Sequence, residues 1–435
     1  MKDIQCATNG ERIRVYKYHT DKFKSENISI YFELPVNKEK SVARSLLLSV
    51  LKRGTEKYPS QKHINERLDE LYATLVNLKN QKFEGVQLLG ISADVICSSY
   101  TENCEDLLDD ALEVIQQISH HPRFDKTTHT FSQEYIQSEK ENYKSIILSQ
   151  INEPRTYAAI RCREEMFASL DLSSRLEDMC DKIDAVTNEE IYECYNELIN
   201  TAKIVVFYVG KRGADEICEK VSAIINTNYV PNTAKMDTKP KLLENLDEPN
   251  VIVESSAISQ GRLVMGFNCG TTWRDEEYYA TLLCNEILGS SPISKLMMNV
   301  REALSLCYEC SSIYNSARGA IFVTTGIDCE NYELAKKEII QQIEDIKSGK
   351  ISEVEFSAAK KSILNAYSSL CDSPSAIERF YLGRIINEID VDIADFLEKI
   401  EDLTIADVVN AAQKISLHTV YFLQGNDTEG GDLYE

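Results

Sequence analysis

The sequence has 435 residues and a mass of 49.4 kDa, more than one hydrophobic core usually holds, so we expect at least two domains. Hydrophobic residues make up 43% and charged residues 27%, a composition that is typical of folded globular proteins and excludes wholesale disorder. The net charge of −23 disfavours nucleic acid and anionic membranes as partners, because phosphate groups would be repelled at long range. The longest apolar cluster, residues 46–51, is too short to span a bilayer, so no membrane segment is predicted.

The cysteines and the first residues bear on the cellular compartment. The chain begins without the apolar stretch of a secretory signal. Its 13 cysteines are an odd number scattered along the sequence, which favours reduced thiols over a disulfide framework. We therefore predict a cytoplasmic protein.

Strand and helix patterns are interleaved along the chain. The alternation typical of strands occurs at residues 12–18, 28–34 and 203–209. Amphipathic stretches that predict helices occupy residues 105–118, 128–150 and 188–199. The pattern predicts a mixed α/β protein.

A polar stretch near the middle divides the chain. Residues 228–250 contain three prolines and little periodicity, as expected of a connector. We predict an N-terminal domain over residues 1–228, a linker over 229–250 and a C-terminal domain over 251–435.

The two halves resemble each other. Residues 181–210 and 398–425 both run from a predicted helix into a β-branched, aromatic strand, with Thr187 and Thr404 as the expected helix N-caps. Earlier in each half, a glycine stands in a similar strand pattern, at Gly90 and at Gly326. Since the order is kept as well as the pattern, we interpret the chain as a duplication. We therefore predict two similar α/β domains.

The sequence SVARSLLLSVLKRGTEKYPS, residues 41–60, resembles the N-terminal helix and following turn of the insulinase/pitrilysin-type zinc peptidases, which include mitochondrial processing peptidase. In this family an HxxEH motif supplies two zinc ligands and a general base from one helix face. The corresponding positions here are Ser45, Leu48 and Ser49, and the third zinc-ligand position is Ile146. The resemblance thus implies a mitochondrial processing peptidase-like fold of class α/β (α+β), in which two similar duplicated domains each layer helices on a mostly antiparallel β-sheet. It also implies no metal and no cofactor in this chain. It looks most like a zinc-less bacterial branch, the elongation-factor-P modification-associated paralogues.

A second matching segment, GSSPISKLMMNVREALSLCY, lies at residues 289–308 and resembles the family segment that supplies substrate-contacting residues. The match places those roles on Arg301 and Tyr308. A guanidinium and a phenol are suited to hydrogen bonding an oxyanion that develops during peptide cleavage. Ser305 departs from the pattern, since the family usually has glycine there. The alternative is that Arg301 is an exposed helical residue and Tyr308 a partly buried strand residue, neither with a role beyond packing.

Other candidate sites are weak in the sequence. The six histidines include no pair at i and i+4 with a carboxylate between them, so solvated loop residues are favoured over metal ligands. Cys307 and Cys310 have CxxC spacing, but they fall in a predicted strand, where residues three apart face opposite sides. We therefore expect neither a redox role nor a metal role for this pair.

Three functions remain open at this point. The first is a non-catalytic subunit that binds peptide, pairs with an HxxEH-bearing zinc peptidase paralogue, and contributes Arg301 and Tyr308 to peptide held at the partner's zinc. Metalloendopeptidase activity is then expected only in that heterodimer. The second is a stand-alone or homodimeric peptide-binding or scaffold protein. The third is a zinc-dependent endopeptidase with an unrecognised site.

Overall fold

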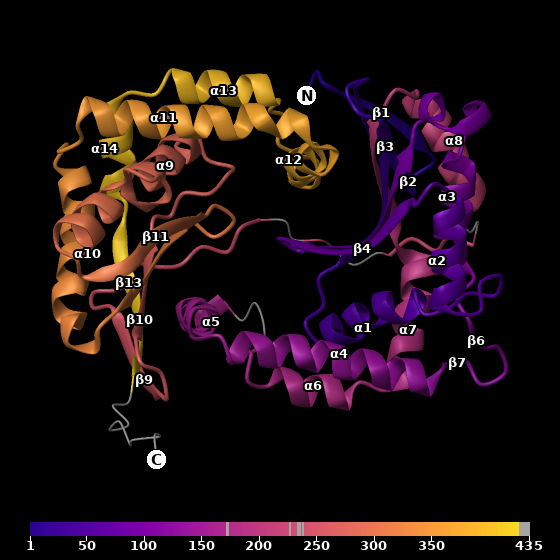
Figure 1. The fold of residues 1–435 in the computed structure, drawn as a ribbon, viewed down its shortest axis with the longest axis horizontal. Coiled ribbons are helices and arrows are strands. Elements are labelled where there is room, and N and C mark those ends of the chain that lie inside the picture. Colours follow the sequence, from indigo (N-terminus) through magenta and orange to yellow (C-terminus); the bar gives the residue numbers. More distant parts are fainter. Residues whose placement is uncertain (171–173, 226–227, 233–235, 237–238, 426–435) are drawn as a thin grey trace, which may run out of the picture. The chain divides into compact units, whose positions relative to one another are not determined.

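The structure is a computed structural model that describes residues 1–170, 174–225, 228–232, 236 and 239–425 (Figure 1). Five residues of the predicted linker, 233–235 and 237–238, lie outside these ranges. The chain divides into two compact units. The first unit comprises Met1–Ile146, Met179–Lys239 and Leu370–Asp392, and the second comprises Ile147–Asp178, Pro240–Ser369 and the described residues from Ile393 onward.

The first unit is built on a six-stranded sheet with the strand order β1-β2-β8-β3-β5-β4. Its strands are β1 (Ile4–Asn9), β2 (Ile13–His19), β3 (Ser25–Pro35), β4 (Leu75–Phe83), β5 (Val86–Ile96) and β8 (Lys203–Gly210). Only the β2–β8 pair is parallel. Its helices are α1 (Ser41–Leu51), α2 (Gln61–Glu70), α3 (Leu108–His120), α6 (Met179–Ala185), α7 (Asn188–Thr201), α8 (Ala214–Ile224) and α12 (Pro374–Ile386). The short hairpin β6 (Phe124–Asp125) and β7 (Thr130–Phe131) precedes α4 (Gln133–Ile151), which begins in this unit and ends in the second.

The second unit is built on a five-stranded sheet with the order β11-β12-β10-β13-β9. Its strands are β9 (Asn250–Ser256), β10 (Gly261–Asn268), β11 (Cys307–Asn315), β12 (Ala320–Ile327) and β13 (Ser416–Gly425). Only the β13–β9 pair is parallel. The helices are α5 (Pro154–Met166), α9 (Tyr278–Asn285), α10 (Tyr332–Lys347), α11 (Glu353–Ser368), α13 (Ile393–Glu401) and α14 (Ile405–Gln413), with π-helical segments η4 (Glu286–Ser290) and η5 (Leu296–Ala303).

The two sheets repeat one topology. Strands β2, β3, β4, β5 and β8 correspond in chain order, position and direction to β9, β10, β11, β12 and β13. The described residues contain no counterpart of β1 in the second sheet. The predicted fold class, two similar mostly antiparallel sheets layered with helices, is confirmed. Within the described ranges, no helix combines the length and the apolar character needed to cross a membrane.

The expected helix caps are confirmed in both units. The Thr187 hydroxyl accepts a hydrogen bond from the Glu190 amide, and the Glu190 carboxylate accepts one from the Thr187 amide. Thr404 and Asp407 make the same reciprocal pair at the start of α14. Each pair satisfies two amides that the first helical turn leaves without partners. The caps therefore fix where the helix before the last strand of each sheet begins.

The matched glycines also occupy equivalent places. Gly90 in β5 lies opposite Tyr31 of β3, and Gly326 in β12 lies opposite Arg262 of β10. A Cβ at Gly90 would overlap the Tyr31 ring, and one at Gly326 would overlap the Arg262 guanidinium. In both sheets the absence of a side chain therefore makes room for a large neighbour on the adjacent strand.

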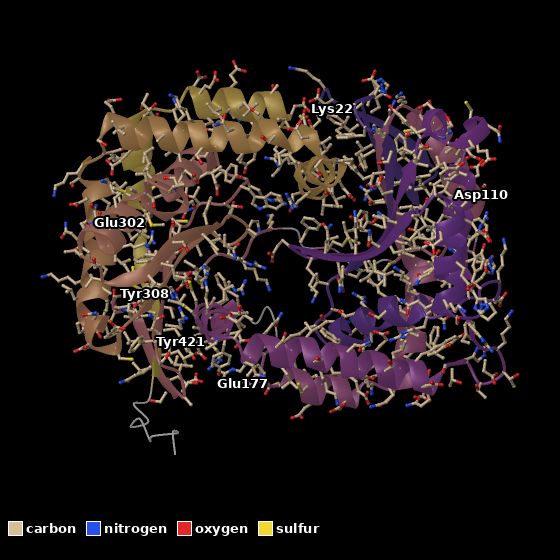
Figure 2. All side chains as sticks on the ribbon, in the orientation of Figure 1. Lys22, Asp110, Glu177, Glu302, Tyr308 and Tyr421 are labelled. Atoms are coloured by element: carbon tan, nitrogen blue, oxygen red, sulfur yellow. The ribbon has the colours of Figure 1, made fainter. Side chains whose placement is uncertain are left out.

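Each sheet is covered in part by a helix from the other half of the sequence. Helix α5 precedes the middle of the chain but packs on β10 and β13, and α12 follows the middle but packs on β8. On the first sheet, the Glu378 carboxylate of α12 accepts hydrogen bonds from Tyr31 Oη at 2.7 Å and Lys79 Nζ at 2.5 Å. On the second sheet, Glu254 of β9 accepts from Tyr157 of α5 at 2.8 Å and from Tyr421 of β13, labelled in Figure 2, at 2.5 Å. A tyrosine–carboxylate hydrogen bond therefore joins helix and sheet in both units.

Candidate functional site

The positions that correspond to the zinc motif lie on α1 and α4. Ser45 Oγ donates to the carbonyl of Ser41, one turn earlier, and accepts from Asn80 Nδ2, both at 3.0 Å. Leu48 is buried and Ser49 is partly exposed, while the side chain at Ile146 is mostly exposed. Aliphatic carbon offers no ligand atom, and a neutral serine hydroxyl is a poor ligand for Zn²⁺ compared with imidazole, thiolate or carboxylate.

Helix α1 is held in place by packing and by one buried arginine. Leu46, Leu47 and Leu51 are almost completely buried on its apolar face. The Arg44 guanidinium, 1% exposed, donates to the Pro35 carbonyl at 2.9 Å and to the Gln87 side chain at 2.8 Å. These contacts hold α1 against the first sheet. Among the described residues there is no group of three or more His, Cys, Asp or Glu side chains that could hold a metal ion.

The second candidate segment lies in the second unit, where η5 leads into β11. The connecting turn requires a left-handed backbone at Ser305, whose φ is 51°. The amide of Ser305 donates to the carbonyl of Arg301 at 3.0 Å, and that of Leu306 donates to Val300 at 3.2 Å, so the two bonds close the end of the helix. A non-glycine residue pays a steric penalty in this conformation. This left-handed backbone explains why the family usually has glycine at this position. In the present chain a serine adopts the same conformation.

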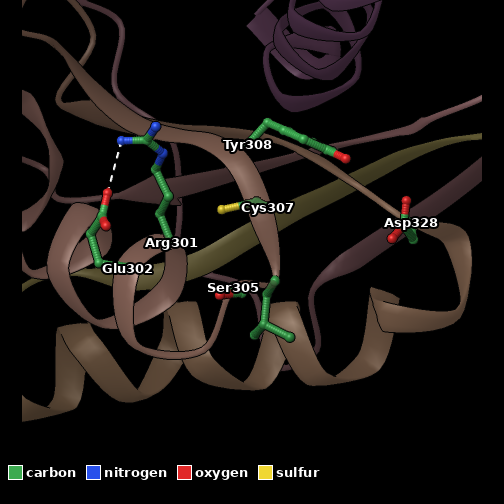
Figure 3. A pocket seen from close by; sticks show the side chains of 7 residues that line it. Arg301, Glu302, Ser305, Cys307, Tyr308 and Asp328 are labelled. Atoms are coloured by element: carbon green, nitrogen blue, oxygen red, sulfur yellow. Dashed lines mark hydrogen bonds and ion pairs between the residues drawn. The ribbon is translucent and has the colours of Figure 1, made fainter.

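Arg301 and Tyr308 line one pocket of about 380 Å³ that belongs entirely to the second unit (Figure 3). Arg301 Nη1 lies 3.0 Å from the carboxylate of the adjacent Glu302, in a pair exposed to solvent. Tyr308 is 74% exposed, and Figure 3 shows its phenol directed away from the Arg301 guanidinium. The sequence therefore identified two residues that share a pocket, although their polar ends do not converge on one point. The pocket is lined by Arg301, Glu302, Ser305, Leu306, Cys307, Tyr308 and Asp328.

The strand that carries Tyr308 contains a β-bulge, which corrects one prediction. Cys307 pairs with Ile327 and Cys310 pairs with Thr325, so Tyr308 and Glu309 together oppose the single residue Gly326. The extra residue shifts the alternation of side chains. Cys307 and Cys310 consequently face the same side of the sheet, and the prediction that they face opposite sides is wrong.

The two thiols interact. A hydrogen bond with Cys310 lowers the pKa of Cys307 to about 7, with help from Thr325 and the positive charge of Arg301 and against the opposing effect of burial. The pKa of Cys310 is raised well above its usual range by the Cys307 sulfur and by burial. At neutral pH, Cys307 is therefore the more readily ionised thiol of the pair.

Sequence reasoning did not place Cys307, Glu302 or Asp328 at this pocket. The CxxC spacing of Cys307 and Cys310 was the one signal in the sequence, but regular strand alternation predicts that the two side chains face opposite sides. The bulge that places them on the same side has no marker in a single sequence. Asp328 follows the last residue of β12, where only strand pairing brings it near η5.

Comparison with known proteins relates the chain to one peptidase family. Residues 185–363 match the family model described as "Peptidase M16 inactive domain". This range includes Arg301 and Tyr308 and excludes the four zinc-motif positions. The chain is 28% identical over 430 residues to "Probable inactive metalloprotease YmfF" of Bacillus subtilis, covering 99% of both chains.

Solved structures share the fold along the whole chain. A conserved protein from Enterococcus faecalis has a TM-score of 0.90 at 24% identity, covering 99% of this chain and all of the other. A peptidase M16 inactive domain from Pseudomonas fluorescens has a TM-score of 0.76 at 15% identity, covering 99% of this chain and all of the other. These structures show the fold, while the family-model match over residues 185–363 and the Bacillus subtilis relative confirm the predicted resemblance to insulinase/pitrilysin-type (M16) peptidases.

Proposed function

We propose that this homologue of the M16 peptidases is a non-catalytic subunit that pairs with an HxxEH-bearing zinc peptidase paralogue. In this proposal the partner supplies the zinc and the general base. The present chain binds the substrate peptide and directs Arg301 and Tyr308 toward its backbone. Peptide cleavage then takes place only in the complex.

One contrast supports the proposal: the zinc-motif positions carry no ligand side chains, whereas Arg301 and Tyr308 line a pocket of the second unit. Serine, leucine and isoleucine occupy the motif positions, so water has neither a metal nor a base to activate it there. Arg301 and Tyr308 are exposed at the pocket rim, and the ion pair of Arg301 with Glu302 is solvent-exposed and therefore weak. Both side chains can turn to a ligand at little cost.

The first experiment is purification of the tagged full-length chain from its native cells, followed by metal analysis. We expect a stoichiometric partner whose sequence contains HxxEH, about one zinc per complex, and no tightly bound zinc on the isolated chain. Chelator-sensitive peptide cleavage by the isolated chain, with one zinc bound, would overturn the proposal.

The second experiment replaces the two substrate-contacting candidates in the reconstituted complex. Loss of a donor to the developing oxyanion predicts a decrease in kcat/KM of about 100-fold for Arg301→Ala. Loss of a single phenolic hydrogen bond predicts about tenfold for Tyr308→Phe. Matched controls are Arg123→Ala and Tyr100→Phe, which make the same replacements at exposed residues of the first unit. Full activity of both test variants, or equal losses in the controls, would contradict the assigned roles.

Peptide binding by the chain alone is the second candidate, favoured by the fact that the pocket is complete within one unit. Titration of unstructured peptides into the isolated chain separates the two candidates. Tight binding without a partner, lost in Arg301→Ala, supports a stand-alone binding protein.

A further inference from the structure

We propose that Cys307 and Cys310 form a redox-active dithiol, which converts to an intramolecular disulfide by exchange with a low-molecular-weight disulfide. This inference is independent of the proposed pairing with a peptidase. It rests on four features of the pair: its position across a bulge, its access to solvent, its charge environment and the difference between the two thiols.

The β-bulge brings the sulfurs together. Cys307 and Cys310 lie opposite Ile327 and Thr325, two residues that are themselves two positions apart and face the same side of β12. Each thiol shifts the pKa of the other, as expected of two neighbouring side chains. In a regular strand, two cysteines three positions apart would be too far apart and on opposite faces to form a disulfide. Because the bulge adds one extra residue, Cys307 and Cys310 are instead separated by about the distance of two regular strand residues. That spacing lies near the upper end of the Cα separations found for disulfides, so only a small adjustment is needed.

Access to solvent differs between the two cysteines. Cys307 lines the pocket beside Arg301 and is 9% exposed, whereas Cys310 is 1% exposed and lies behind it (Figure 3 shows the Cys307 sulfur on the Arg301 side of the strand). A small disulfide can therefore reach Cys307 through the pocket, while Cys310 is reached through Cys307. This is the arrangement of an attacking thiol and a resolving thiol.

The charges around the pair favour a thiolate at the pocket side. Arg301 places a positive charge near Cys307. The nearest carboxylate on the strand, Glu309, is paired with Arg155 at 2.7 Å and lies 3.5 Å from Arg262, which reduces its repulsion of a thiolate. A thiolate is the nucleophile in disulfide exchange, so the surroundings promote reaction at Cys307.

The exchange balances in two steps. The Cys307 thiolate attacks one sulfur of the small disulfide, whose S–S bond breaks and releases one thiolate while a mixed disulfide forms on Cys307. Cys310 then loses its proton and attacks the Cys307 sulfur, forming the intramolecular disulfide and releasing the second small thiolate. The protein loses two electrons and two protons, and the small disulfide is reduced to two thiols.

The disulfide would close a ring around Tyr308 and Glu309. If the proposed function also holds, oxidation restrains the orientation of Tyr308 and so regulates peptide contact. This consequence rests on the proposed function, whereas formation of the disulfide does not.

The test is a cysteine map of the full-length wild-type chain. The reduced protein is incubated with oxidised glutathione and then unfolded in urea with iodoacetamide, so that every remaining thiol is alkylated. It is then digested and analysed by mass spectrometry. We expect Cys307 and Cys310 to lose alkylation together and to appear in a linked peptide that dithiothreitol reverses. Cys162 and Cys284 are the matched controls: both are buried, with pKa values that burial raises to about 12, and both should stay reduced and so be fully alkylated after unfolding.

Two variants separate the steps. In Cys310→Ser we expect a stable glutathione adduct on Cys307, because the resolving thiol is absent. In Cys307→Ser we expect modification of Cys310 at least about tenfold slower than that of Cys307, because it is buried and protonated. Wild-type protein whose Cys307 stays fully alkylatable, or keeps glutathione without forming the linked peptide, would overturn the inference. Since the wild-type map needs neither a partner nor a peptide, its outcome is distinct from that of the proposed function.

Discussion

In both units a carboxylate joins a helix to the sheet, but the carboxylate is on the helix in the first unit and on the sheet in the second. Each must attach a helix from the other half of the sequence to its sheet, and each uses a tyrosine–carboxylate hydrogen bond. In the first unit the acid, Glu378, is on the helix and 2% exposed, with Lys79 beside it. In the second unit the acid, Glu254, is on the edge strand β9 and 35% exposed, near Arg161. The two units therefore share a tyrosine–carboxylate hydrogen bond between helix and sheet, but a different element supplies the carboxylate in each.

The two units also differ in a connection between corresponding strands, which joins β3 to β4 in the first unit and β10 to β11 in the second. In the first unit it contains the well-packed helix α1, whose motif positions have no ligand chemistry. In the second unit it contains α9, η4 and η5, ends at the left-handed Ser305, and exposes Arg301 and Tyr308. Strand pairing and helix packing preserve the fold, while the polar residues on the connections differ freely.

The largest difference between the units is expected at the matched glycines. Gly90→Ala should destabilise the first unit by about 3 kcal/mol, because the new Cβ overlaps the buried ring of Tyr31, which is held by Glu378. Gly326→Ala should cost about 1 kcal/mol or less, because the Arg262 guanidinium can move toward solvent. Hydrogen exchange of both sheets in urea measures the two effects. Equal losses would show that the two glycines do not differ in this way.

The next effect concerns the two carboxylates. Glu378→Gln should cost about 2 kcal/mol, because Lys79 loses its charged partner in a buried setting. Glu254→Gln should cost about 1 kcal/mol, because its surroundings are wetter. The single tryptophan, Trp273, lies in the second unit, so its fluorescence should report the Glu254 change and not the Glu378 change. A larger loss at Glu254 would reverse the comparison.

Acid should weaken the first unit through His120. Burial, with Arg12 and His121 nearby, lowers the pKa of His120 to about 4, whereas an unfolded histidine titrates near 6.5. The unfolded state therefore takes up a proton first as the pH falls through 6.5, and stability present above that pH is lost down to about pH 4. Between pH 7 and 5.5 this amounts to about 1 kcal/mol.

Urea unfolding at the two pH values checks this expectation, with His120→Gln as the variant in which that contribution disappears. His418 of the second unit, whose pKa burial also lowers, is the matched comparison. A wild-type pH dependence that is unchanged in His120→Gln would rule out His120 as its source.

The smallest effect is a stabilisation. Ser305→Gly should raise the stability of the second unit by about 0.5 kcal/mol, since relief of the left-handed strain exceeds the added flexibility of glycine. Trp273 fluorescence in urea measures the shift. Ser305→Ala is the control, and it should bring no gain because alanine keeps the Cβ.

Local chemistry explains which features could be predicted from sequence. The caps at Thr187 and Thr404 and the paired glycines have local signatures, so the duplication and the fold class were accessible. The exchange of α5 and α12 was not, because an amphipathic pattern shows which face of a helix is apolar but not which sheet covers it. The bulge at Tyr308 and Glu309 was not accessible either, since alternation presumes a regular strand. At the candidate site, the sequence identified Arg301 and Tyr308, whose substrate roles remain proposals, and missed the thiol beside them.

The exchanged helices also determine the order in which the protein can mature during synthesis. Helix α12 belongs to the first unit but leaves the ribosome after α5 and after strands β9 to β12 of the second unit. Domains usually fold from the N-terminus as they emerge from the ribosome. Until α12 has been synthesised, however, the face of β8 that it covers remains exposed in the nascent chain. Synthesis of the first unit therefore starts before that of the second but is completed only after most of the second has been made. A premature stop anywhere before α12 leaves both units incomplete.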